Sequence, residues 1–167
     1  MNPNIKFLFL FYKNLIYMSS YNIIETEQEL NECKNCAIFT FDGEIHLVKV
    51  IKCYDGDTIH CIFKCNNKYS IFNVRMYGYD SAEMKPSKSI PEPQRSEIKR
   101  NAVKAKEKLE ELILNKNVYL FCKGFDKYGR ILGIIKTNID DNKSINDIVI
   151  EEGYGYVYYG GTKDDQS

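Results

Sequence analysis

Short β-type segments separated by tight turns dominate the middle of this chain and most constrain its fold. Ile45–Cys53 alternates loosely and is rich in β-branched residues, which predicts a strand. Asp55-Gly56 is a turn signal, and Thr58–Lys64 and Lys68–Tyr77 predict two more strands, joined by a turn at Asn66-Asn67. The pattern therefore predicts a three-stranded antiparallel meander.

The second half of the chain adds a helix, two strands and another helix. Apolar residues recur at steps of three and four from about Arg95 to Leu114, which predicts an amphipathic helix. Val118–Lys123 and Ile131–Thr137 predict two strands, and Ser144–Asp147 resembles a capping box that opens a short helix. We therefore expect a mainly β protein with helices (α+β). Its core would be a five-stranded Greek-key barrel of the oligonucleotide-binding (OB) fold, with one long and one short helix.

Three regions follow from this pattern. The chain of 167 residues is 44% hydrophobic, so it can form one domain with a hydrophobic core. We place the barrel domain at residues 45–160 and a flexible tail at residues 161–167. Residues 1–44 form an N-terminal extension that we expect to be partly disordered, with one ordered piece at Ala37–Phe41.

The first residues bear on where the protein resides. Ile5–Tyr17 is mostly apolar but interrupted by lysine and asparagine, and it is too short to span a bilayer. We expect Met18 to be the true start and the protein to be cytoplasmic and monomeric. Secretion, or a weak membrane tether through residues 1–17, is the alternative.

Charge is balanced over the whole chain but not along it. There are 23 Lys and Arg residues and 23 Asp and Glu residues, which argues against a surface coated in basic charge. Residues 19–44 hold six acidic residues and one lysine, whereas residues 84–108 hold eight basic and three acidic residues. The basic segment can meet a polyanion, or it is the solvated face of the predicted helix.

The six cysteines leave two interpretations open. Cys33 and Cys36 have the spacing of half a zinc site, and a zinc-stabilised interaction domain would use them. No second pair with matching spacing follows them. Free thiols in a reducing compartment are therefore our expectation for all six cysteines.

Three patches carry the charged residues with the clearest chemical meaning. They are Asp55-Gly56-Asp57-Thr58, the segment from Arg75 to Asp80-Ser81-Ala82-Glu83, and Asp126-Lys127-Tyr128-Gly129-Arg130. Each patch lies at or near a predicted strand end, so their side chains can meet at one edge of the barrel. Carboxylates hold a hard cation, and guanidinium groups grip a phosphate. Together they are suited to phosphodiester hydrolysis.

Each patch also has a simpler explanation. Asp-Gly-Asp-Thr is a good turn sequence in any protein. Arg75 lies in a mostly apolar strand, where an unpaired charge is costly, so it can be a structural partner of Asp80 or Glu83. Arg130 can be an ordinary surface residue.

The order and separation of the three patches resemble the staphylococcal nuclease (thermonuclease) family, from about Ile45 to Tyr159. The resemblance implies an OB-fold barrel. It also implies Ca²⁺-dependent hydrolysis of DNA and RNA through the phosphate backbone, with little sequence specificity and with 3′-phosphate products. A non-catalytic module of the same family, binding nucleic acid or protein, is the alternative.

The resemblance also implies roles for individual residues. The metal ligands are Asp57, Asp80 and the backbone carbonyl of Ser81; the catalytic residues are Arg75, Glu83 and Arg130; and the substrate-binding residues are Lys127, Tyr128 and Tyr159. Glu83 matches the glutamate that activates or orients water. Ser81-Ala82 stands where the family has Thr-Pro, which loosens this loop. Tyr159 matches a base-stacking tyrosine, with packing of the tail as the alternative.

Overall fold

The computed structural model describes residues 26–160, and the chain divides into two compact units, Met1–Phe39 and Thr40–Ser167. The predictions for residues 1–17 and 161–167 lie outside the described residues. In the first unit, helix α2 spans Glu27–Glu32. Thr26 caps it: its hydroxyl accepts from the N–H of Glu29, whose carboxylate accepts from the N–H of Thr26. Ala37–Phe41, expected as an ordered piece, forms no helix or strand, although Phe41 at its end is buried.

The expectation of six free thiols is wrong for two of them. Cys33 and Cys36 form a disulfide with their Cα atoms 6.8 Å apart. The left-handed backbone of Asn35, at φ 64°, turns the chain between them and brings the two side chains together. The other cysteines in the described part of the chain, Cys53, Cys61, Cys65 and Cys122, are free. A cystine cannot supply thiolates to zinc, so the structure gives no support to the zinc interpretation.

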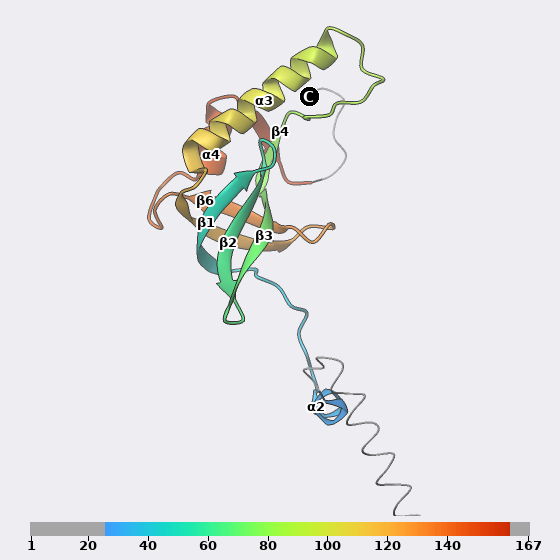
Figure 1. Ribbon diagram of the computed structural model, residues 1–167, viewed down its shortest axis with the longest axis vertical. Helices are drawn as coiled ribbons and strands as arrows, with labels where there is room; N and C mark the ends of the chain where they lie inside the picture. Colours follow the sequence, from blue (N-terminus) through green and yellow to red (C-terminus); the bar gives the residue numbers. More distant parts are fainter. Residues whose placement is uncertain (1–25, 161–167) are drawn as a thin grey trace, which may run out of the picture. The chain divides into compact units, whose positions relative to one another are not determined.

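The second unit is built around a closed five-stranded barrel with strand order β1-β2-β3-β6-β5 (Figure 1). Its strands are β1 (Ile45–Cys53), β2 (Thr58–Cys65), β3 (Lys68–Met76), β5 (Asn117–Phe125) and β6 (Ile131–Lys136). Neighbouring strands are antiparallel except β3 and β6, which are parallel. The predicted meander and the five-stranded barrel are therefore confirmed.

Every second side chain of each strand points into the barrel and fills its interior. Along β2, Ile59, Cys61 and Phe63 are buried, whereas the residues between them are more exposed. Because the same alternation recurs on the other strands, one face of each points inward. Full burial of each large apolar side chain stabilises the fold by about 1.5–3 kcal/mol. Phe41 packs its ring edge against Phe63 and Phe72, and so extends the core with an aromatic cluster.

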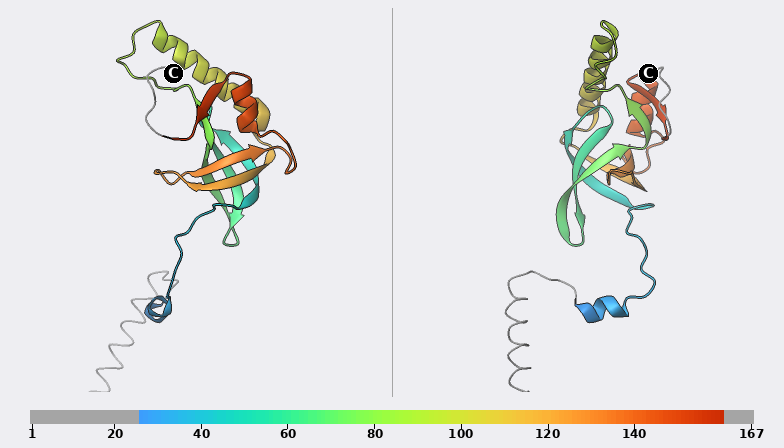
Figure 2. Two further views of the ribbon diagram at one scale, coloured as in Figure 1. Left: turned by 180° about the vertical axis from the view of Figure 1, so that it is seen from behind. Right: turned by 90° about the vertical axis from the view of Figure 1, so that its right-hand side faces the viewer.

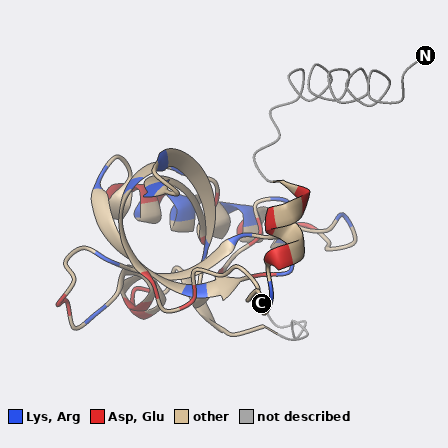
Figure 3. Ribbon diagram, turned by 90° about the horizontal axis from the view of Figure 1, so that it is seen from below, with Lys and Arg blue, Asp and Glu red and all other residues tan. Residues whose placement is uncertain are grey.

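Two helices cover one end of the barrel (Figure 2). Helix α3 (Gln94–Ile113) buries Ala102, Ala105, Leu109 and Ile113, at steps of three and four. Helix α4 (Ile145–Glu151) starts at Ser144, which forms the predicted capping box with Asp147. Figure 3 looks along the barrel, with α3 on its far side. Both predicted helices are confirmed.

The sequence did not predict a second, two-stranded sheet. Strands β4 (Gly78–Ser81) and β7 (Gly155–Tyr158) are antiparallel. Gly78 has φ 73°, a conformation that glycine adopts at low cost, and there the chain leaves β3 and enters β4. A Cβ atom on Gly155 would lie 2.2 Å from the Asp80 carbonyl oxygen, so only glycine permits this close pairing. Among residues 26–160, no helix is long and apolar enough to cross a bilayer.

Candidate active site

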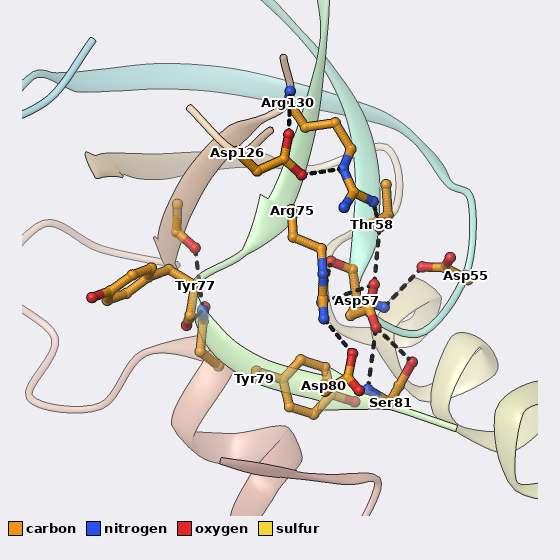
Figure 4. Close-up of polar contacts among 12 residues, drawn as sticks. Asp55, Asp57, Thr58, Arg75, Tyr77, Tyr79, Asp80, Ser81, Asp126 and Arg130 are labelled. Carbon is orange, nitrogen blue, oxygen red and sulfur yellow. Dashed lines mark hydrogen bonds and ion pairs between the residues drawn. The ribbon is translucent and has the colours of Figure 1, made fainter. Parts of the chain in front are cut away.

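The fold brings three separate turns and strand ends together. Register pairs Thr58, at the start of β2, with Arg75, near the end of β3. This places Asp57 beside Arg75, and β4 then carries Asp80 back toward the same point (Figure 4). The turn between β5 and β6 supplies Arg130. Asp57, Arg75, Asp80 and Arg130 all line one pocket of about 800 Å³.

Arg75 lies between two carboxylates at the base of this pocket. One terminal nitrogen, Nη1, is 2.8 Å from Asp57 Oδ1, and the other, Nη2, contacts Asp80 Oδ1. The three side chains are only 5–12% exposed. The ion pair with Asp80 considered from the sequence is therefore present, and Asp57 is a second partner. A guanidinium serves both because it presents several donors in one rigid plane.

Asp57 is held by donors from two elements. Its Oδ1 accepts from the Thr58 hydroxyl at 2.9 Å, and its Oδ2 accepts from both the N–H and the hydroxyl of Ser81 at 3.1 Å. Ser81 thus fixes the carboxylate with its side chain as well as its backbone. Tyr156, on the neighbouring strand β7, donates its hydroxyl to Asp80 Oδ2 at 2.6 Å. The sequence analysis gave Tyr156 no role.

Negative charge exceeds positive charge at this inner cluster. Asp55 is half-buried and its Oδ1 accepts from the N–H of Asp57 at 3.1 Å. Burial, together with the nearby Asp57 carboxylate, raises the pKa of Asp55 to about 6. Asp55 therefore adds a third carboxyl group beside the two, Asp57 and Asp80, that contact Arg75.

This donor chemistry suits a hard cation. Within residues 26–160, no three His, Cys, Asp or Glu side chains are arranged to hold a metal by themselves. Asp57 and Asp80 would therefore need further oxygen ligands, such as the Ser81 carbonyl and water, which Ca²⁺ and Mg²⁺ both accept. The surplus carboxylate charge around Arg75 favours a cation, so the residues fit the ion that the sequence resemblance implies.

Arg130 is oriented by its own turn. Gly129, at φ 77°, lets the chain turn so that Asp126 Oδ1 accepts from the N–H groups of Tyr128 and Arg130, each at 2.9 Å. Arg130 Nε donates to Asp126 Oδ2 at 2.7 Å, and its Nη1 reaches the Thr58 hydroxyl at 3.4 Å. Arg130 is therefore tied to the site and is not a free surface residue.

The same hydrogen bonds keep Asp126 ionised. Burial alone would raise the pKa of Asp126. Hydrogen bonds from the backbone and the guanidinium of Arg130 outweigh burial and hold the pKa below its ordinary value. The Asp126 carboxylate therefore orients the Arg130 guanidinium. Asp126 belongs to the third sequence patch, but the sequence analysis assigned it no role.

Aromatic and basic side chains form the rim of the pocket. Tyr128 and Tyr159 are 72% and 70% exposed. Lys127 Nζ and Arg130 Cζ lie 5.1 and 5.5 Å from the centre of the Tyr128 ring. Tyr159 meets the edge of Tyr77, with ring centres 5.4 Å apart. Tyr159 therefore leaves most of its side chain exposed while its ring contacts Tyr77, so base stacking and packing of the tail both stay predictions.

The pocket gathers every residue to which the family resemblance gives a metal-binding, catalytic or substrate-binding role. Its lining includes Asp57, Arg75, Asp80, Ser81, Glu83, Lys127, Tyr128, Arg130 and Tyr159. Glu83 is exposed and lies just beyond β4. Tyr54, Asp55 and Tyr77 also line the pocket, and the sequence analysis gave them no role. Proximity alone does not assign chemical roles to these residues.

Comparison with known proteins supplies independent information. A family model described as "Staphylococcal nuclease homologue" matches residues 73–167, more than half of the chain. A protein of Haemophilus influenzae named "Uncharacterized endonuclease" is 30% identical over 115 residues. That match covers 69% of this chain and 54% of the relative, so the chain spans about half the length of the curated relative it matches.

Proposed function

Because this chain belongs to the staphylococcal nuclease family, we propose that it is a Ca²⁺-dependent nuclease. It would hydrolyse phosphodiester bonds of DNA and RNA with little sequence preference and leave 3′-phosphates. The observation that carries the proposal is the guanidinium of Arg75, which is bound between Asp57 and Asp80 in the same pocket as Arg130 and Glu83.

The two arginines are suited to bind and stabilise a phosphate. Arg75 approaches it from the base of the pocket, and Arg130 from the turn above, where Asp126 fixes its plane. Bidentate guanidinium contacts fit the oxygens of a phosphate. The same contacts would strengthen as charge develops on those oxygens and on the leaving 5′-oxygen. A single preorganised donor of this kind is worth about 100-fold or more in rate.

Glu83 and the rim complete the proposed mechanism. Glu83 is exposed at the pocket, where it can orient a water molecule and accept its proton. Lys127 and Tyr128 would contact the adjacent phosphate, and Tyr159 would stack on a base. Contacts to phosphate rather than to base edges explain why little sequence preference is expected.

Asp57, Asp80 and the Ser81 carbonyl would hold the cation. When bound, Ca²⁺ would supply positive charge beside the scissile phosphate. The three residues already lie together, because both carboxylates contact Arg75 and Ser81 donates to Asp57. Two carboxylates and a carbonyl with several waters suit either Ca²⁺ or Mg²⁺, and the proposal names Ca²⁺ because the resemblance to the staphylococcal nuclease family implies it.

The test is digestion of an end-labelled oligonucleotide with and without Ca²⁺, followed by end-group analysis. Wild type should cleave in Ca²⁺, stop in EGTA, and leave 3′-phosphates. Glu83→Gln should lose most of the activity, whereas Glu107→Gln, a matched change of an exposed carboxylate on α3, should retain it. Equal rates in Mg²⁺ would refute the choice of cation. Equal rates in the two variants would refute the role of Glu83.

A further inference from the structure

The small sheet of β4 and β7 brings a tyrosine hydroxyl against Asp80. Register places Asp80 directly opposite Tyr156, and side chains opposite each other in an antiparallel pair lie on the same face. The hydroxyl donates to Asp80 Oδ2 at 2.6 Å, a length typical of a hydrogen bond to an ionised carboxylate. Tyr156 is half-buried and, within residues 26–160, is not one of the side chains that line the pocket. It therefore acts on the site through Asp80 and not through the substrate.

Tyr156 and Arg75 hold different oxygens of the Asp80 carboxylate. Arg75 uses Nη1 on Asp57 and Nη2 on Asp80, where it contacts Oδ1. A contact at one oxygen leaves rotation about the Cβ–Cγ bond of an aspartate, because this torsion has a broad energy minimum. Tyr156 holds the other oxygen, Oδ2, from a different strand. The two contacts together fix the plane of the carboxylate.

The tyrosine fixes Asp80 without offsetting its charge. A phenol hydroxyl donates a hydrogen bond but carries no charge, whereas a lysine or arginine in its place would neutralise the carboxylate. The surplus of carboxyl groups, Asp55, Asp57 and Asp80 beside Arg75, is therefore kept. Each carboxylate oxygen has two lone pairs, so Oδ2 can accept from Tyr156 and still coordinate a hard cation.

The strand that carries Tyr156 is held in place by other contacts as well. A Cβ atom on Gly155 would lie 2.2 Å from the Asp80 carbonyl oxygen, so the two backbones are in close contact there. Tyr79 lies on the opposite face of β4 from Asp80. It is fully buried, and its hydroxyl donates to the Tyr154 carbonyl at 3.0 Å. Removal of the Tyr156 hydroxyl alone should therefore leave β7 paired with β4.

We propose that Tyr156 is a positioning residue that holds the Asp80 carboxylate in the orientation needed to bind Ca²⁺. This inference rests on the proposed function. Hydrogen-bond partners of metal ligands do not touch the metal, yet their loss typically costs about 10- to 100-fold in metal affinity or activity. Without the hydroxyl, the Asp80 carboxylate can turn about its contact with Arg75. Its orientation must then be restored on binding, so the affinity for Ca²⁺ falls.

The test variant is Tyr156→Phe, which removes the hydroxyl and keeps the ring. The control is Tyr79→Phe, which removes a hydroxyl from the same sheet that donates to Tyr154 and not to Asp80. Calorimetric titration with CaCl₂, without nucleic acid, gives the Kd of each folded protein, and urea unfolding gives the stability that each has lost. Tyr156→Phe should bind Ca²⁺ about tenfold more weakly than wild type, and Tyr79→Phe should bind it as wild type does. Equal weakening in both variants would show that a loosened sheet is responsible and would overturn the proposal.

A cleavage measurement separates this role from the nuclease assignment. On an end-labelled oligonucleotide, Tyr156→Phe should need about tenfold more Ca²⁺ for half-maximal rate and should approach the wild-type rate at saturating Ca²⁺. An unchanged Ca²⁺ requirement with a lower saturated rate would contradict a role in positioning Asp80.

The two measurements together give distinct outcomes. If wild type cleaves nothing but binds Ca²⁺ about tenfold more tightly than Tyr156→Phe, the positioning role is supported and the nuclease function is not. If both proteins bind Ca²⁺ and cleave alike, the positioning role is overturned and the nuclease function stands. A wild type that binds no Ca²⁺ also overturns the positioning role, and cleavage measured in Mg²⁺ then reports on the nuclease function by itself.

Discussion

Replacement of Asn146 by alanine should destabilise the fold strongly, because this side chain ties three segments together. Asn146 is 3% exposed. Its Oδ1 accepts from the N–H of Ile135 at 3.0 Å, and its Nδ2 donates to the carbonyls of Tyr77 at 2.9 Å and Gly133 at 3.2 Å. One amide thus links α4 to β6 and to the bend that leads into β4.

The magnitude follows from the groups that would lose a partner. The Gly133 carbonyl keeps its hydrogen bond from the N–H of Tyr77 at 2.8 Å, so Ile135 and Tyr77 contribute most of the loss. Leaving a buried donor or acceptor unsatisfied costs about 1–3 kcal/mol. The two groups together therefore predict a loss of about 4 kcal/mol, a large part of the roughly 5–15 kcal/mol that stabilises a typical domain.

Urea unfolding followed by circular dichroism measures this loss. Asn146→Ala should lower the midpoint with an unchanged m value. Asn101→Ala, on the exposed side of α3, should change the unfolding free energy by less than about 0.5 kcal/mol. A loss below about 1 kcal/mol for Asn146→Ala would mean that the three hydrogen bonds contribute little or that water replaces the amide.

Three further predictions follow from the site and the core. Gly155→Ala should separate β4 from β7, because the added Cβ would clash with the Asp80 carbonyl. Oligonucleotide cleavage should then fall sharply. A wild-type cleavage rate would show that the pairing of β4 with β7 is not needed for activity. Asp126 has a folded pKa below its unfolded value of about 3.9, so its stabilisation is complete above that value and is lost as pH falls through the folded pKa. Asp126→Asn should therefore lose less stability on acidification than wild type, as urea unfolding against pH would reveal. Burial raises the pKa of Cys53 and Cys61 to about 12 and of Cys122 to about 11; after reduction, a thiol reagent should label these three only on unfolding, and rapid labelling of the native protein would contradict their burial.

The strands and helices were predictable where one side of the element is buried. Apolar alternation in β1 to β3 and the steps of three and four in α3 place Val50, Ile59 and Leu109 in the core, so periodicity alone located them. The start of α4 was predictable because the capping box of Ser144 and Asp147 is a local sequence motif. The Thr26–Glu29 capping box that opens α2 is an equally local motif, so this helix too is predictable from the sequence.

The small β4–β7 sheet was not predictable in the same way. Each strand has four residues, too few to show a period, and their pairing joins segments far apart in the chain. The hydrogen bond from Tyr156 to Asp80 depends on that pairing. The motifs identified the charged residues of the pocket, but only the fold shows that Arg75 contacts Asp57 as well as Asp80.

The most direct test of the central claim is the cleavage rate of Arg75→Gln, measured where the variant is shown to be folded. If Arg75 acts on the substrate phosphate, the rate should fall at least about 100-fold, even in a temperature range where circular dichroism matches wild type. If the folded variant cleaves an oligonucleotide at the wild-type rate in Ca²⁺, Arg75 is only a structural partner of Asp57 and Asp80. The proposed active site would then be contradicted.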